Sequence, residues 1–188
     1  CNLAQNKSMD SNRIFNIQSE EDFSQLCFEV FEYQYENCKV YQSFCKHFNK
    51  NPDNVKILQD IPFLPIEFFK KKQILSSQQL VQKVFTSSGT SNQTPSKHHI
   101  TDIELYQKNF SQIFQSQYGA IEDYAIVALL PSYLEREGSS LIYMVNHLIK
   151  KTRHPKSGFF LNDFKSLKNT IEYHEAKKQK TLKSLRTA

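Results

Sequence analysis

The amino-acid sequence predicts a layered α/β fold, in which N-terminal helices precede alternating strands and helices. Residues 19–48 carry apolar side chains at helical spacing, and residues 124–131, "YAIVALLP", form an apolar run that a proline closes. Such a run is typical of a strand buried on both faces. Helical patterns on either side of this run complete the alternation on which the fold class depends.

The N-terminal part predicts two helices and an extended segment. Ser19 followed by Asp22 resembles a helix start, and a second helical pattern ends before the turn "NKNPDN". Pro62 and Pro65 in "IPFLPIEFFKKKQIL" exclude a regular helix across their positions. We therefore expect an extended segment with apolar side chains to bury, and an exposed basic turn at "FFKKK".

Strands and helices are expected to alternate from residue 84 onward. Short strands at 84–86 and 97–100 flank a hydroxyl-rich loop, and Thr101 with Glu104 has the pattern of a capping box. The helix that this box opens is expected to end at Gly119, a natural left-handed cap. Further elements are a helix at 140–149, a strand at "SGFFL" and a last helix to about His174, capped by Asn162 or Asp163.

The positive charge of the chain is concentrated at its end. The sequence has 24 Lys and Arg against 19 Asp and Glu, but five of the basic residues follow the last acidic residue, Glu175. The remaining body is neutral, which argues against a nucleic-acid-binding protein with a basic folded face. Residues 177–188 are expected to be a solvated basic tail without a strand. Met9 is a candidate natural start, which makes residues 1–8 an extension or an expression remnant.

The spacing of the four cysteines does not predict a metal site. Cys1, Cys27, Cys38 and Cys45 include no CxxC pair, and no Cys/His set has zinc spacing, so no metal is expected. Cys38 and Cys45 are seven residues apart and are expected to be buried on one helix face. Reduced thiols, no secretion signal and no apolar run long enough to span a bilayer favour a cytoplasmic protein.

The loop "TSSGTSNQTPSK", residues 86–97, is the strongest candidate site. A phosphate cradle needs consecutive backbone N–H groups, a glycine that permits close approach, hydroxyl donors and a cation. The loop offers each of these in Thr86, Ser87, Ser88, Gly89, Thr90, Ser91 and Lys97. The same residue types are ordinary turn formers, and an exposed polar hairpin stays open as the alternative. The Walker pattern GxxxxGK[ST] is absent.

This loop resembles the first core motif of the adenylate-forming enzymes, the acyl-CoA synthetase and luciferase superfamily. Together with "IPFLPIEFFKK", "LPSYLEREGSSLIYM" and "SGFFLNDF", it is similar to the acyl-protein synthetase branch, the LuxE type, over about residues 10–176. Asn92 stands where a glycine is usual in that motif. The chain has about half the family's usual length, so the resemblance implies a partial N-terminal adenylation domain at 9–176 and a fragment inactive alone.

The resemblance implies a two-step reaction. A fatty or other carboxylic acid attacks ATP, with Mg²⁺ bound alongside the nucleotide, and the acyl adenylate then passes its acyl group to a protein thiol. The implied partners are the acid and an acyl-accepting protein or reductase subunit, with no nucleic acid and no membrane span. No cysteine of this chain matches the family's acceptor. A phenylacetate-type acyl-CoA ligase and a non-catalytic nucleotide- or partner-binding remnant remain alternatives.

A second candidate site follows the buried strand. Ligands often bind beyond the carboxyl ends of strands in α/β proteins. Side chains expected to line such a substrate pocket are Tyr133, Glu135, Arg136, Ser139 and Ser140. The alternative is that Ser139 caps the next helix and the charges are solvated. His98 and His99 beside the first loop are expected to face solvent, although either could reach an anion.

Overall fold

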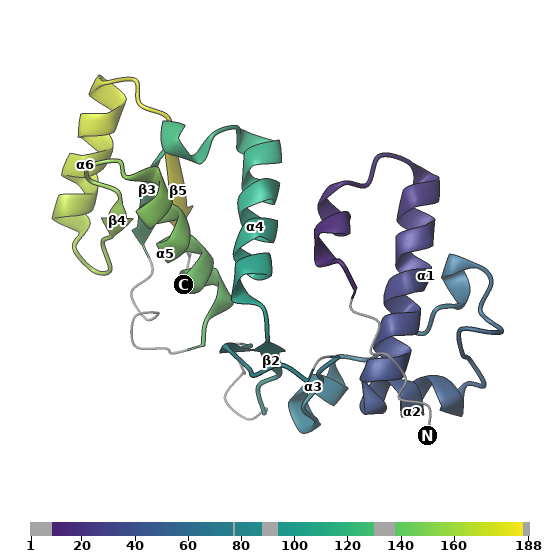
Figure 1. The fold of residues 1–188 in the computed structure, drawn as a ribbon. Helices are drawn as coiled ribbons and strands as arrows, with labels where there is room; N and C mark the ends of the chain where they lie inside the picture. Colours follow the sequence, from purple (N-terminus) through teal and green to yellow (C-terminus); the bar gives the residue numbers. More distant parts are fainter. Residues whose placement is uncertain (1–8, 77, 88–93, 130–137, 186–188) are drawn as a thin grey trace. The chain divides into compact units, whose positions relative to one another are not determined.

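The computed structural model describes residues 9–76, 78–87, 94–129 and 138–185, with side chains to residue 183. The chain forms two units, Cys1–Leu105 and Tyr106–Ala188. The elements are mixed helices and strands, as the sequence predicts (Figure 1). No helix within these described ranges is long and apolar enough to cross a membrane.

The first unit begins with helices, and the longest of them starts after the predicted cap Ser19. The elements are η1 (Ser11–Phe15), α1 (Glu20–Asn37), α2 (Lys39–His47), η2 (Leu58–Asp60) and α3 (Glu67–Lys71). The Ser19 hydroxyl accepts a hydrogen bond from the Asp22 amide at 3.0 Å and caps α1. The core of this unit contains Phe31, Tyr41 and the two thiols of Cys38 and Cys45, which confirms the predicted burial of both cysteines.

The helix α3 corrects the prediction that residues 61–75 are extended throughout. Pro65 lies just before this helix, and its carbonyl accepts a hydrogen bond from the Phe68 amide at 3.1 Å. Proline is tolerated at a helix start because the N–H that it lacks would have no partner there. Pro65 therefore precedes a short helix, instead of excluding helix from the whole segment.

The strands β1 (Lys83–Thr86) and β2 (Lys97–Ile100) pair antiparallel, close to the predicted ranges. The next helix, α4 (Ile103–Tyr118), is capped differently from the prediction. The Asp102 carboxylate accepts the hydrogen bond from the Leu105 amide at 2.9 Å, one residue after the expected cap at Thr101. A carboxylate is a strong acceptor at the positive end of a helix, which favours Asp102.

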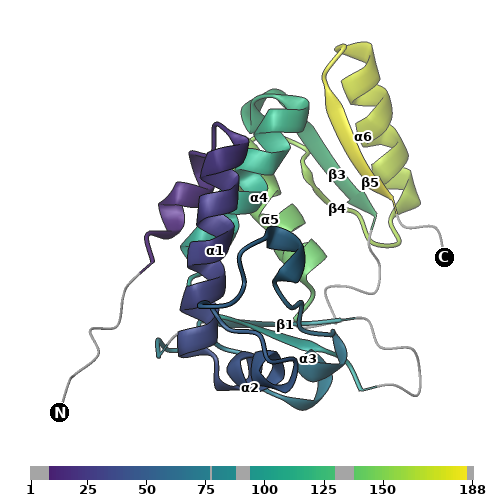
Figure 2. The same cartoon turned by 90° about the vertical axis from the view of Figure 1, so that its right-hand side faces the viewer.

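The second unit is built on a three-stranded parallel sheet in the order β4-β3-β5. Its elements after α4 are η3 (Ile121–Asp123), β3 (Ala125–Leu129), α5 (Ser140–Thr152), β4 (Gly158–Phe159), α6 (Phe164–Ala176) and β5 (Thr181–Leu185). The first four residues of β3 are fully buried, which confirms the predicted buried strand. Helices α4 and α5 lie on one side of the sheet and α6 on the other, as both views show (Figure 2).

The helix ends of this unit follow the sequence signals. Gly119 has a φ of +89° and donates its N–H to the Gln115 carbonyl at 2.9 Å, so it is the predicted left-handed cap of α4. The Asp163 carboxylate accepts a hydrogen bond from the Ser166 amide and caps α6. Hydrogen bonds with Ser166 hold the pKa of the Asp163 carboxyl below its usual range.

The strand β5 contradicts the prediction of a solvated tail after Glu175. Residues 181–185 pair with β3 along its whole length, from Ala125 opposite Thr181 to Leu129 opposite Leu185. Leu182 packs against the buried core of the unit. Lys180 and Lys183 lie close to this leucine, which is why the charge pattern alone suggested a tail. The boundaries 9–176 and 177–188 as domain limits stay predictions.

Candidate functional site

The two strands of the hairpin hold both ends of the hydroxyl-rich loop. Thr86 lies opposite Lys97 at the last strand pair before the loop, and Phe85 beside it is only 4% exposed. The structure thus describes three of the predicted phosphate-binding residues, Thr86, Ser87 and Lys97. The other four, Ser88, Gly89, Thr90 and Ser91, lie outside the described residues.

Two serines close the base of this loop. The Ser87 amide donates to the Ser96 carbonyl at 3.0 Å, and the Ser96 amide donates to the Ser87 hydroxyl oxygen at 2.9 Å. Ser96 is buried, so this pair is fixed at the end of the hairpin. The Ser87 N–H is committed to the hairpin and is not a free donor. Its hydroxyl hydrogen can still be donated to a ligand, because only the oxygen's acceptor capacity is used here.

Lys97 is the exposed cation at this position. It is the first residue of β2 and lies one residue beyond the buried Ser96. A lysine ammonium on a flexible stem is suited to balancing the charge of a phosphate held by backbone amides. The strand fixes where the side chain starts, while the stem leaves its end free to follow a ligand.

The histidines of β2 are partly buried, so the prediction that they face solvent was wrong. The His98 ring stacks on the Phe69 ring, with centroids 4.8 Å apart and an interplanar angle of 21°. His99 has a buried Nδ1 without a hydrogen-bond partner in the described structure. The cause is α3, which contacts β2 and covers the hairpin where the sequence predicted only an exposed turn.

The second candidate site is described only at its end. Tyr133, Glu135 and Arg136 lie outside the described residues. The Ser139 hydroxyl accepts a hydrogen bond from the Ile142 amide at 3.4 Å and caps α5, whose first residue is Ser140. Ser139 therefore has the structural role that the sequence left open as the alternative.

A polar group between α4 and α5 was missed by sequence reasoning. The Gln107 amide donates to the Tyr143 hydroxyl at 2.6 Å, and Tyr106 shares a hydrogen bond with Ser140. Burial raises the pKa of the Tyr106 hydroxyl, which stays neutral. Helical periodicity alone does not show which aromatic residue also carries a hydrogen bond.

The described part of the chain offers no ready metal site, since it contains no group of three or more His, Cys, Asp or Glu side chains arranged to hold an ion. A metal bound with a nucleotide would depend on the phosphates for its ligands, as Mg²⁺ commonly does. The hydroxyls of Thr86 and Ser87 and the ammonium of the exposed Lys97 are the kinds of group that bind phosphate oxygens.

Comparison with known proteins assigns the family. The model described as acyl-protein synthetase, LuxE, matches residues 10–131, which is more than half of the chain. The chain belongs to the LuxE acyl-protein synthetase family. The matched range contains α1 to β3 and the whole hairpin with its loop.

A curated relative is consistent with this family. The long-chain-fatty-acid–luciferin-component ligase of Photorhabdus luminescens is 35% identical over 66 residues, which is 35% of this chain and 56% of that protein. The chain therefore matches little more than half the length of this relative. No solved structure matches the chain.

Proposed function

We propose that the protein activates a fatty or other carboxylic acid with ATP and passes the acyl group to a protein thiol. The observation that carries this proposal is the hairpin of β1 and β2, which holds a hydroxyl-rich loop beside an exposed lysine in a chain of the LuxE family. The relative's name, a long-chain-fatty-acid ligase, supports a fatty acid as the substrate.

The chain's own residues would bind the phosphates of the nucleotide and offset their negative charge. Backbone donors of residues 88–91 and the hydroxyls of Thr86 and Ser87 would hold the β- and γ-phosphates, and Lys97 would offset their negative charge. Mg²⁺ bound with the nucleotide would share that charge. Holding the phosphates in one place positions the α-phosphorus, and positioning together with charge stabilisation is the main protein contribution to reactions of this kind.

The proposed reaction has two balanced steps. A carboxylate oxygen attacks the α-phosphorus of ATP, and pyrophosphate leaves with the electrons of the broken P–O bond. A thiolate then attacks the acyl carbon of the adenylate, and AMP leaves. No cysteine of this chain is assigned as the acceptor.

The test is acid-dependent exchange of labelled pyrophosphate into ATP by the natural full-length protein. The expected result is exchange that requires a carboxylic acid, with AMP as the nucleotide product when a thiol acceptor is added. Acyl transfer to protein but not to coenzyme A would distinguish the acyl-protein synthetase from an acyl-CoA ligase. Formation of ADP and phosphate would contradict adenylate chemistry.

A further inference from the structure

The first unit contains an apolar cavity of about 470 Å³. Side chains of α1, among them Leu26, Cys27 and Val30, line one wall, and Tyr41 of α2 lines another. Further lining residues, among them Phe63 and Phe69, come from the segment after η2. Cavities of this size are in the range that binds small molecules.

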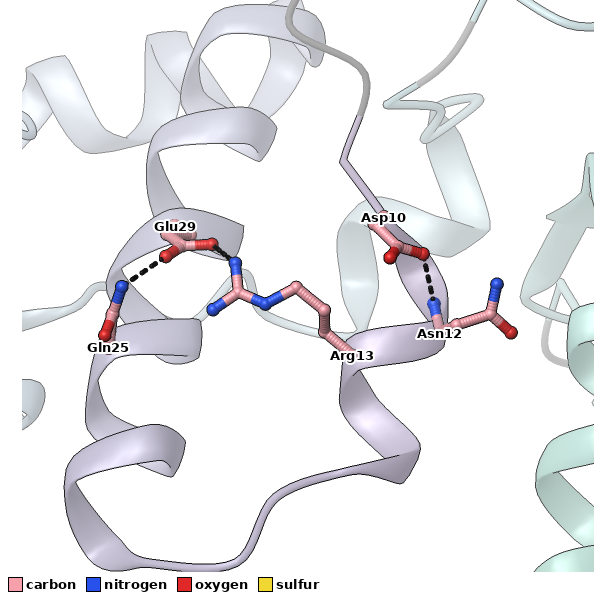
Figure 3. A network of polar contacts seen from close by, with 5 residues as sticks. All are labelled: Asp10, Asn12, Arg13, Gln25 and Glu29. Carbon is pink, nitrogen blue, oxygen red and sulfur yellow. Dashed lines mark hydrogen bonds and ion pairs between the residues drawn. The ribbon is translucent and has the colours of Figure 1, made fainter.

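Polar contacts hold η1 against α1 at one wall of the cavity. The Arg13 guanidinium of η1 forms an ion pair with the Glu29 carboxylate of α1, and the Gln25 amide donates to the same carboxylate at 3.0 Å (Figure 3). Ile14, the residue after this arginine, also lines the cavity. The ion pair therefore keeps an apolar side chain of η1 at the cavity wall.

The residues that line the cavity favour a ligand group that is uncharged and flexible. None of the described residues that line the cavity is charged. The Tyr41 hydroxyl donates to the Pro62 carbonyl at 2.7 Å, so its hydrogen is already used, and burial raises the pKa of this hydroxyl. Gln34 and Ser76 also line the cavity, but most of its lining is apolar and suits the apolar area that an alkyl chain provides.

One aromatic ring contacts both the cavity and the hairpin. Phe69 lines the cavity, and the same ring stacks on His98, which follows Lys97 directly in β2. The ring of Phe69 is therefore the contact that joins the cavity to the hairpin. Three lysines, residues 70–72, follow Phe69 along the chain.

We propose that this cavity binds the alkyl chain of a long-chain fatty acid, with the carboxylate directed toward the hairpin. The inference rests on the proposed function, because that function supplies a fatty acid as substrate and phosphates at the loop. It adds the site: the acyl chain is held by α1, α2 and the segment around α3, ahead of the loop in sequence. Each additional buried methylene group is expected to tighten binding about fourfold.

The experiment measures binding without nucleotide, on the 188-residue chain. Cys27 lines the cavity and is partly exposed, so its alkylation by N-ethylmaleimide reports occupancy. Hexadecanoate, kept below its aggregation concentration, is expected to slow alkylation of the Cys27 peptide. Octanoate is expected to need a concentration at least about tenfold higher, because it buries fewer methylene groups.

Two variants locate the binding. Val30→Trp fills the cavity from α1, and Glu36→Trp places the same side chain at an exposed position of the same helix. Hexadecanoate protection is expected to be lost in the first and retained in the second. Phe63→Ser removes a cavity side chain that is 85% exposed, so folding is expected to be intact while the affinity falls.

Equal protection by both acids, no protection, or protection unchanged in Val30→Trp and Phe63→Ser would overturn the proposal. Because no nucleotide is present, these outcomes are independent of acid activation. Acid-dependent pyrophosphate exchange without protection of Cys27 would place the acyl chain elsewhere and leave the proposed function intact. Protection without exchange would keep the cavity as a fatty-acid site and contradict the activation chemistry.

Discussion

Lys97 is expected to matter for the nucleotide and little for folding. It is exposed at the start of β2, and a charge-assisted contact to a phosphate is typically worth about 1.5–3 kcal/mol. Lys97→Ala should therefore weaken ATP binding by roughly tenfold or more. Titration calorimetry with Mg·ATP measures this change, and thermal unfolding should shift by only a few degrees. Lys83→Ala, an exposed lysine at the far end of the same hairpin, is the matched control and should bind ATP normally.

His174 is expected to make stability depend on pH. Its ring is fully buried, and both of its nitrogens are without hydrogen-bond partners in the described structure. Burial lowers the pKa of this imidazole below 6.5, and the nearby His154, Lys156 and Lys177 lower it further. The unfolded chain therefore binds more protons as the pH falls below about 6.5, and the folded state loses stability in that window.

The variant His174→Leu tests this assignment. Leucine cannot be protonated and suits a fully buried site, so the variant should unfold at a higher temperature than the wild type at pH 5.5. At pH 7.5 the difference should be small or reversed, because the neutral wild-type ring packs against His154 and Tyr173. Parallel loss of stability in both proteins on acidification would assign the effect to other groups, of which His147 also has a pKa lowered by burial.

At the scale of the elements, the cap of α1 is a direct test of local structure. Ser19→Ala removes the hydroxyl that satisfies the Asp22 amide and should cost about 1 kcal/mol of folding free energy. Ser43→Ala makes the same substitution within α2, at an exposed position where alanine is the better helix former. Denaturant unfolding should show a loss only in the first variant. Equal effects would indicate that the cap does not determine where α1 begins.

The strand β5 is where the observed structure differs from the solvated tail that the sequence predicted. Leu182 packs on the core, so Leu182→Ala should lower the folding free energy by about 1–2 kcal/mol, less than for a fully buried leucine. The adjacent Lys183→Ala removes only an exposed ion pair with Glu175 and should be nearly neutral. Thermal unfolding measures both variants. No effect of Leu182→Ala would support a solvated end after residue 176.

Much of the fold was predictable because its signals are local. Ser19, Gly119 and Asp163 each mark a helix end through a side chain or backbone property that acts within one turn, and all three predictions were correct. β5 and the burial of His98 were not predictable in this way. Both depend on contacts with segments distant in sequence, β3 for the strand and α3 for the histidine.

The candidate site was predictable to a similar extent. The hairpin stem follows from two short strands around a loop of turn residues, and the structure places Thr86 opposite Lys97 accordingly. The cavity was missed. The apolar side chains of "IPFLPIEFFKK" were expected to be buried, but Phe63 is 85% exposed and Ile66 is 50% exposed. Sequence pattern indicates which side chains are apolar, but it does not show which of them stay exposed around an open cavity.

For the whole molecule, the charge distribution predicts that nucleic acid is not a ligand. The body carries balanced charge, and two lysines near the end of the chain, Lys180 and Lys183, form ion pairs with Asp123 and Glu175. A protein surface with balanced charge and paired lysines releases few counterions from a nucleic acid, so it gains little binding free energy from that release. We expect no measurable retention of duplex DNA at physiological salt in a mobility-shift assay. Tight binding with a steep salt dependence would contradict this expectation.

The most direct test of the central claim, that the hairpin loop grips nucleotide phosphates, is amide hydrogen exchange with and without Mg·ATP. The account predicts slower exchange in peptides that span residues 83–100, because backbone N–H groups of the loop would be donated to phosphate oxygens. Peptides from α6 should be unaffected. Pyrophosphate alone should reproduce part of the protection, and adenosine should not. Protection confined to other segments, or no protection at a saturating nucleotide concentration, would contradict the account.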